Sequence, residues 1–131
     1  MGRSMAKVGD LDPGSYVIVN EEPCVVTKKS ESSPGDGDNP KEEKVYVEGL
    51  FDGQKRTFVE SVENKVEVPV VEEGSAQILA IIGNSAQLMD MASYETFEVT
   101  IPLELRGELE EGDEVIYTQA LGRKKIERKK G

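Results

Sequence analysis

Short runs of alternating apolar residues, each bounded by a turn signal, recur along this chain and restrict the folds open to it. The first two runs are Tyr16–Val19 and Cys24–Thr27, which follow the turn signals Asp12-Pro13-Gly14 and Glu21-Glu22-Pro23. Alternation with a period of two between closely spaced turns predicts strands, and we find no competing helical periodicity. The pattern therefore predicts an all-β fold built from small barrels.

The strand pattern continues through the middle of the chain. Lys44–Glu48 alternates, and Val45 and Val47 share one face. The Asp52-Gly53 pair that follows is a hairpin signal, because both residue types readily adopt positive φ angles. Thr57–Val59 then resumes the sheet. These segments predict a hairpin within the first barrel.

A domain junction is indicated near Pro69. Val66, Val68 and Val70 alternate with other residues, but proline is poorly tolerated inside a central strand. A chain of 131 residues suits two small domains. We expect a tag or disordered start at 1–6, a first barrel at 7–68 with a mobile loop at 30–43, and a second domain at 69–131.

The second half predicts short strands around a short helical turn at 102–109. The expected strands are Gln77–Ile82, Ala86–Met89, Phe97–Ile101, Val115–Tyr117 and the stretch around Ile126. This number of strands in about 60 residues suits a closed barrel of the OB type.

Composition favours a binding protein over an enzyme. The chain has no histidine, so the commonest general base and the commonest metal ligand are missing. Cys24 is the single cysteine and lies in an apolar stretch, which predicts a buried thiol in a reducing compartment. No apolar run is long enough to span a membrane. We expect no cofactor, a cytoplasmic location and a monomer.

The 30–43 segment is acidic and almost without apolar side chains. Its carboxylates and amides have the chemistry of ligands for a hard cation such as calcium, but their spacing does not reproduce an EF-hand loop. The residues in question are Asp36, Asp38, Asn39, Glu42 and Glu43. We expect a solvated loop and no metal site.

Basic residues gather at two places although the net charge is −10. Lys55 and Arg56 follow the predicted hairpin turn, and the last ten residues are strongly basic. The basic residues of that end are Arg123, Lys124, Lys125, Arg128, Lys129 and Lys130. They could hold RNA phosphates. The alternative, that they only keep a turn and a terminal segment soluble, stays open.

Several blocks, taken in order, resemble archaeal members of the initiation factor five-A family of translation factors, whose bacterial relative is elongation factor P. The blocks are Val8-Gly9-Asp10-Leu11, Gly14-Ser15-Tyr16-Val17, Gly49-Leu50-Phe51-Asp52-Gly53, Val66-Glu67-Val68-Pro69-Val70 and Gln87-Leu88-Met89-Asp90-Met91. The resemblance implies an SH3-like barrel followed by an OB barrel. It also implies a ribosome-binding protein that contacts tRNA and aids peptide bond formation on stalled ribosomes.

The family acts through a loop lysine that is converted to hypusine, a long cation that reaches the end of the peptidyl tRNA. The family loop reads like Pro-Gly-Lys-His-Gly. Here the matching stretch is Pro34-Gly35-Asp36-Gly37-Asp38, so a carboxylate stands where the modified lysine belongs, and Lys41 matches a second loop lysine. We therefore expect an unmodified chain. The alternative function is a non-hypusinated paralogue that acts as a scaffold or as an RNA-binding protein.

Overall fold

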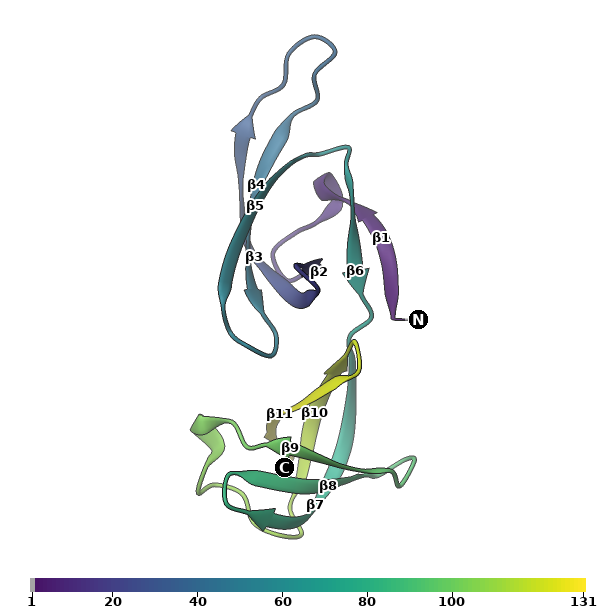
Figure 1. The fold of residues 1–131 in the computed structure, drawn as a ribbon, viewed down its shortest axis with the longest axis vertical. Helices are drawn as coiled ribbons and strands as arrows, with labels where there is room; N and C mark the ends of the chain where they lie inside the picture. Colours follow the sequence, from purple (N-terminus) through teal and green to yellow (C-terminus); the bar gives the residue numbers. More distant parts are fainter. Residues whose placement is uncertain (1) are drawn as a thin grey trace. The chain divides into compact units, whose positions relative to one another are not determined.

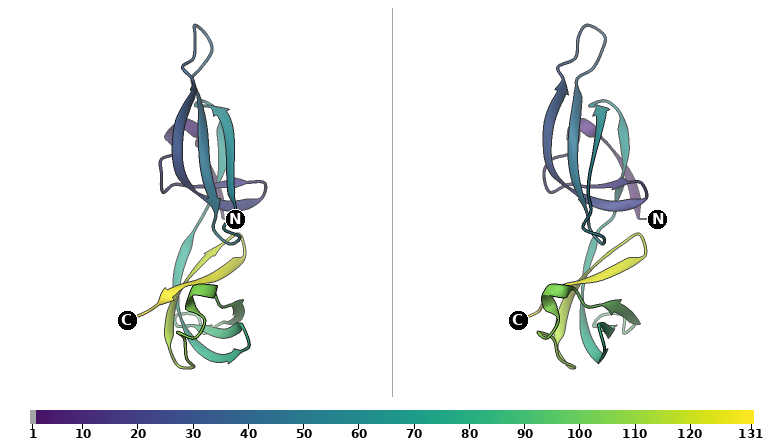
Figure 2. Two further views of the ribbon diagram at one scale, coloured as in Figure 1. Left: turned by 90° about the vertical axis from the view of Figure 1, so that its left-hand side faces the viewer. Right: turned by 60° about the vertical axis from the view of Figure 1, so that its left-hand side comes forward.

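The computed structural model describes residues 2–131 and divides them into two compact β units, the first ending at Val70 and the second spanning Val71–Gly131 (Figure 1 and Figure 2). The sequence placed the junction between residues 68 and 69. Pro69 is the last residue of a strand, where its missing N–H is tolerated.

The first unit is a curled antiparallel sheet with strand order β2-β3-β4-β5, completed by the pair β1-β6. Its core is made by residues that alternate along these strands, as the period of a pleated strand requires. The elements are β1 Arg3–Lys7, η1 Val8–Asp10, β2 Tyr16–Val19, β3 Glu22–Ser33, β4 Glu42–Gly49, β5 Lys55–Ser61 and β6 Lys65–Pro69. The buried core is Val8, Leu11, Val17, Cys24, Val26, Val45 and Val47.

The second unit is an antiparallel sheet with strand order β11-β10-β7-β8-β9 that curls around its own core. Its elements are β7 Glu72–Ile82, β8 Ser85–Asp90, β9 Thr96–Thr100, η2 Leu103–Leu105, β10 Glu114–Ala120 and β11 Arg123–Lys129. The core is Ala76, Ile78, Ala86, Leu88, Val99, Ile101, Leu109, Val115, Tyr117 and Ile126. The prediction of an all-β chain, SH3-like barrel first and OB barrel second, is confirmed.

Two predicted irregular segments are strands in the structure. Residues 3–6, expected to be a tag or disordered start, lie in β1 and pair antiparallel with β6, while Met1 lies outside the described residues. The 30–43 loop is also shorter than expected, because β3 runs to Ser33 and β4 begins at Glu42. In both cases pairing with a neighbouring strand orders a polar sequence that has no apolar alternation of its own.

A tyrosine on β10, Tyr117, packs against β7 and makes a hydrogen bond to the last residue of β8. Its ring lies over Gly74, where an added Cβ would stand 2.7 Å from ring carbons, so β7 needs a glycine there. The Tyr117 hydroxyl donates to Asp90 Oδ2, and the backbone N–H groups of Ala92 and Ser93 donate to Asp90 Oδ1. These hydrogen bonds lower the pKa of Asp90 to about 2, and the bond from the Tyr117 hydroxyl has the largest effect.

This carboxylate should make the second unit acid-sensitive in a defined window. Asp90 has a folded pKa below its ordinary value of 3.8, so its stabilising effect is present above about pH 4 and is lost as the pH falls towards 2. We expect the urea midpoint of the second unit to fall across this window. In an Asp90→Asn variant the midpoint should fall less, and an equal fall in both proteins would contradict the assignment.

Candidate functional site

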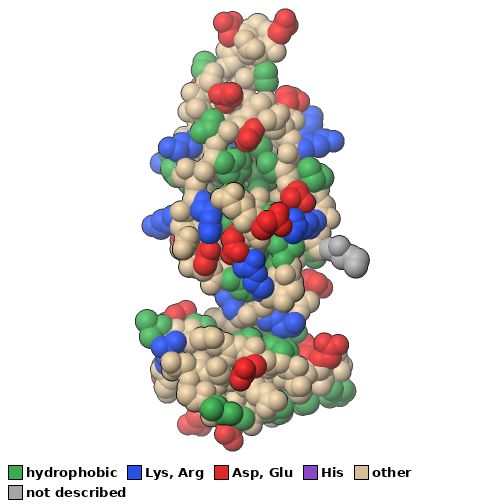
Figure 3. Space-filling view, in the orientation of Figure 1, with side chains coloured by type: hydrophobic (Ala, Val, Ile, Leu, Met, Phe, Trp, Pro, Cys, Tyr) green, Lys and Arg blue, Asp and Glu red, His purple; other side chains and the backbone are tan. Residues whose placement is uncertain are grey.

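The tip of the β3–β4 hairpin is the first candidate site, because the sequence placed the family's modified residue there. The Asp36 N–H donates to Asn39 O at 3.0 Å, and the Asn39 N–H donates to Asp36 O at 2.7 Å. Gly37 and Asp38 form the turn between them, and Gly37 has a φ of 54°. Asp36 and Asp38 are exposed, and acidic side chains mark the end of this hairpin in Figure 3.

A glycine holds the turn in its shape. Gly35 has a φ of 82°, and a Cβ at this position would stand 2.8 Å from Asn39 O and 2.9 Å from Lys41 N. These are backbone atoms, so a side chain could not be accommodated by a simple rotamer change. The Pro34-Gly35 pair thus has a structural role that does not depend on the residue at position 36.

Lys41 lies at the base of the hairpin and away from its tip. Its backbone oxygen accepts from the Val62 N–H at 2.9 Å. Its Nζ lies 3.5 Å from Glu31 Oε2 and 3.9 Å from Glu43 Oε2. The amine is therefore held between carboxylates from β3 and β4.

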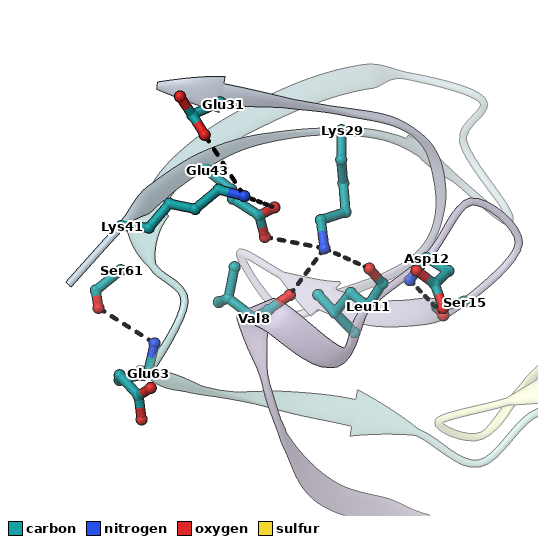
Figure 4. A network of polar contacts seen from close by, with 10 residues as sticks. All are labelled: Val8, Leu11, Asp12, Ser15, Lys29, Glu31, Lys41, Glu43, Ser61 and Glu63. Atoms are coloured by element: carbon teal, nitrogen blue, oxygen red, sulfur yellow. Dashed lines mark hydrogen bonds and ion pairs between the residues drawn. The ribbon is translucent and has the colours of Figure 1, made fainter. Parts of the chain in front are cut away.

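A half-buried ion pair lies next to Lys41 and joins the hairpin to the start of the chain (Figure 4). Lys29 Nζ lies 2.9 Å from Glu43 Oε1, and both side chains are 14% exposed. The same ammonium donates to Leu11 O at 2.6 Å and to Val8 O at 3.3 Å. One cation thus forms an ion pair with a carboxylate and donates hydrogen bonds to two carbonyl groups beside η1.

The acidic residues of this region are not gathered in the structure as ligands around one point. Within residues 2–131, no group of three His, Cys, Asp or Glu side chains has an arrangement suited to a metal ion. Glu43 is engaged by Lys29 instead. The reading of a cation-binding loop receives no support from this geometry.

The two basic residues that follow the hairpin turn, Lys55 and Arg56, lie on opposite sides of β5. Because successive residues of a strand face opposite sides, Arg56 shares a side with Val47, while Lys55 lies opposite Glu48 on the other side. Arg56 makes a two-pronged contact with Asp52, with Nη2–Oδ2 at 2.7 Å and Nη1–Oδ1 at 3.3 Å. This contact lowers the pKa of Asp52 to about 2. The guanidinium of Arg56 is therefore engaged by Asp52 of the turn, whereas Lys55 is exposed.

The basic end of the chain is a strand, β11, and most of its cations lie beside carboxylates. The ion pairs are Lys125–Glu127, Arg128–Glu73, Lys129–Asp113 and Lys130–Glu114. Lys124 differs, because its Nζ lies 5.1 Å from the centre of the Phe97 ring. Arg123 begins the same strand. The local positive charge of this segment is thus smaller than its sequence indicates.

Sequence reasoning missed a cluster on the outer side of the first sheet. The ammonium groups of Lys28 and Lys44 each lie 5.2 Å from the centre of the Tyr46 ring. The alternation of buried Val45 and Val47 could have placed Lys44 and Tyr46 on this outer side. Lys28 could not have been placed, because a bulge between Val26 and Lys28 shifts the register.

Cys24 is fully buried, as predicted, and burial raises the pKa of its thiol.

No helix in residues 2–131 is long and apolar enough to cross a membrane. Two small β-barrels, the first with a projecting polar hairpin, define the structural class of this protein.

Comparison with known proteins places the chain within this class. No family model matches the chain. Translation initiation factor 5A of Methanosarcina mazei is 46% identical over 125 residues, which cover 95% of this chain and 97% of the relative. The same factor of Methanothermobacter thermautotrophicus is 45% identical over 131 residues and covers both chains fully.

Solved structures give the same result. The structure described as eukaryotic translation initiation factor 5A from Methanococcus jannaschii matches with a TM-score of 0.90 and 39% identity, covering 98% of this chain and 96% of that one. A family protein from Naegleria fowleri shares the fold at a TM-score of 0.79 and 21% identity. The chain belongs to the translation initiation factor 5A family and has a translation factor role. The scaffold alternative receives no support from these matches.

Proposed function

We propose that this chain works in the cytoplasm, binds the ribosome, contacts tRNA and aids peptide bond formation on ribosomes that have stalled. The observation that carries the proposal is full-length similarity to relatives named translation initiation factor 5A, with 46% identity over 95% of the chain. A projecting β3–β4 hairpin at the position of the family's modified loop supports it. The chain acts here as a binding partner of the reacting centre, without a catalytic residue of its own.

RNA contacts come from cations that the fold leaves available. Among the predicted residues, Lys55 is exposed and Lys124 lies over an aromatic ring, whereas Arg56 and Lys125 are beside carboxylates. We assign the main contacts to Lys55 and Lys124, and Arg56, Arg123 and Lys125 contribute less. Phosphate neutralisation by lysine and arginine makes such binding weaken as salt rises.

The hairpin approaches tRNA without an added aminobutyl cation. Asp36, at the position of the family's modified lysine, has no amine to accept the group. Lys41 is the loop lysine, and its amine lies between Glu31 and Glu43 at the base. A carboxylate at the tip repels phosphate, so the hairpin contributes position and shape to the complex and no charge attraction.

Intact-mass spectrometry tests the modification state. After incubation with spermidine and the family's modifying enzyme, the protein should show no added aminobutyl mass. An Asp36→Lys variant is the matched comparison, because it restores an acceptor at the tip. Added mass on the unaltered protein, mapped by fragmentation to Lys41, would contradict the prediction.

Translation of a message with a run of proline codons tests the function. In a reconstituted system that lacks its own factor of this family, adding the protein should increase the full-length product. A variant that cannot bind ribosomes serves as the negative control. An unchanged yield at saturating protein would reject the proposed role in peptide bond formation.

A further inference from the structure

The outer side of the first sheet carries two lysines, Lys28 and Lys44, to which the proposed function assigns no contact. Lys28, Tyr46 and Thr57 lie in one row across β3, β4 and β5, and Ser30, Lys44 and Val59 lie in the next row. Directly paired residues of an antiparallel sheet point to the same side. Since Val45 and Val47 point into the core, these rows point outward.

Tyr46 stands at the centre of this surface. The ammonium groups of Lys28 and Lys44 both lie 5.2 Å from its ring centre, so the ring draws two like charges together. Lys55, one row further along, adds a third cation on the same side. We call Lys28, Lys44, Tyr46 and Lys55 the outer-sheet cluster.

These lysines differ from most other cations of the first unit. Arg3, Lys7, Lys29, Lys41 and Arg56 lie in ion pairs. In the described part of the chain, no ion pair involves a lysine of the outer-sheet cluster. Glu48, opposite Lys55, and Glu42, opposite Ser61, stand at the two ends of the surface, and the centre has no carboxylate. The net charge of the chain is −10, yet the outer-sheet cluster gathers lysines that form no ion pair with a carboxylate within residues 2–131.

We propose that the outer-sheet cluster binds the phosphodiester backbone of an RNA helix. The inference rests on the proposed ribosome binding and gives it a contact surface. Lysine holds phosphate as a point charge, and serine, threonine and tyrosine hydroxyls donate to phosphate and sugar oxygens. Ser30, Thr57 and Tyr46 supply these hydroxyls on the same side. No recess for a base is needed, because backbone contacts position an RNA without reading its sequence.

Two double variants, each with two lysines replaced by glutamine, test the inference. In Lys28→Gln/Lys44→Gln, the affinity for a fluorescent RNA hairpin in low salt should fall about tenfold, and the slope of log affinity against log salt should shrink by about 2. Lys7→Gln/Lys65→Gln is the control, because it removes the same charge from the first unit on β1 and β6. The control should bind like the unaltered protein. Equal losses in the two double variants would overturn the inference.

Two further measurements separate this inference from its alternatives. Poly-glutamate of matched charge should compete poorly with the RNA hairpin, and strong competition would assign the surface to an acidic protein and overturn the proposal. Ribosome sedimentation of the same variants separates it from the proposed function. Sedimentation of Lys28→Gln/Lys44→Gln equal to its control would reject the surface while leaving ribosome binding intact. Should the double variant fail to fold, Lys44→Gln takes its place, with an expected reduction of the salt slope by about 1.

Discussion

Replacing Lys29 with methionine should lower the free energy of unfolding of the first unit by about 3 kcal/mol. The substitution keeps most of the apolar stem and removes the ammonium that lies 2.9 Å from Glu43 Oε1. Glu43 then loses its nearest cation while its side chain remains largely buried. The carbonyl groups of Val8 and Leu11 also lose their donor.

Lys28→Met is the matched control for this prediction. Lys28 precedes Lys29 in β3 but points to the outer side of the sheet and is exposed. Its removal should change stability by less than about 0.5 kcal/mol. Urea titration monitored by hydrogen exchange of first-unit amides gives both values. Similar urea midpoints for the two variants would show that the Lys29–Glu43 pair does not hold β3 and β4 to the start of the chain.

The second large effect is expected from truncating Leu88. This side chain is fully buried among the apolar residues of the second unit, next to Ile78 and Val99 in the same core. Leu88→Ala should lower the free energy of unfolding of that unit by about 2–5 kcal/mol, from lost burial plus the cavity left behind. Leu103→Ala makes the same chemical change at a side chain that is 75% exposed. Hydrogen exchange of second-unit amides should show protection falling in the first variant alone, and equal losses would contradict the core assignment.

The parts of the fold that the sequence predicted are those in which apolar alternation is strong. Val45 and Val47 indicated β4, and Phe97 and Val99 indicated β9. Strand β1 and the second half of β3 were missed, since their residues are mostly polar. Their order comes from hydrogen bonds to β6 and β4, which are long-range partners that a local pattern does not reveal.

The candidate site was predictable to a smaller degree. The resemblance located the Pro34–Asp38 turn, because Pro-Gly is a local signal. The ion pair between Arg56 and Asp52 depends on which side of β5 the Arg56 side chain faces. That side is set by the register between β5 and β4. The placement of Lys28 depends on a β-bulge, which shifts the side of every later residue. Pairing register was the missing information in both cases.

Co-sedimentation with archaeal ribosomes tests the central claim most directly. The protein should sediment with ribosomes in low salt and be released as the salt concentration rises, because the contacts to RNA that we propose are made by lysine and arginine. Lys124→Glu/Lys125→Glu should weaken the binding, while the exposed second-unit change Leu103→Ala should leave it unchanged. Protein that stays in the supernatant at low salt, with both units folded, would contradict the claim that this chain acts on the ribosome.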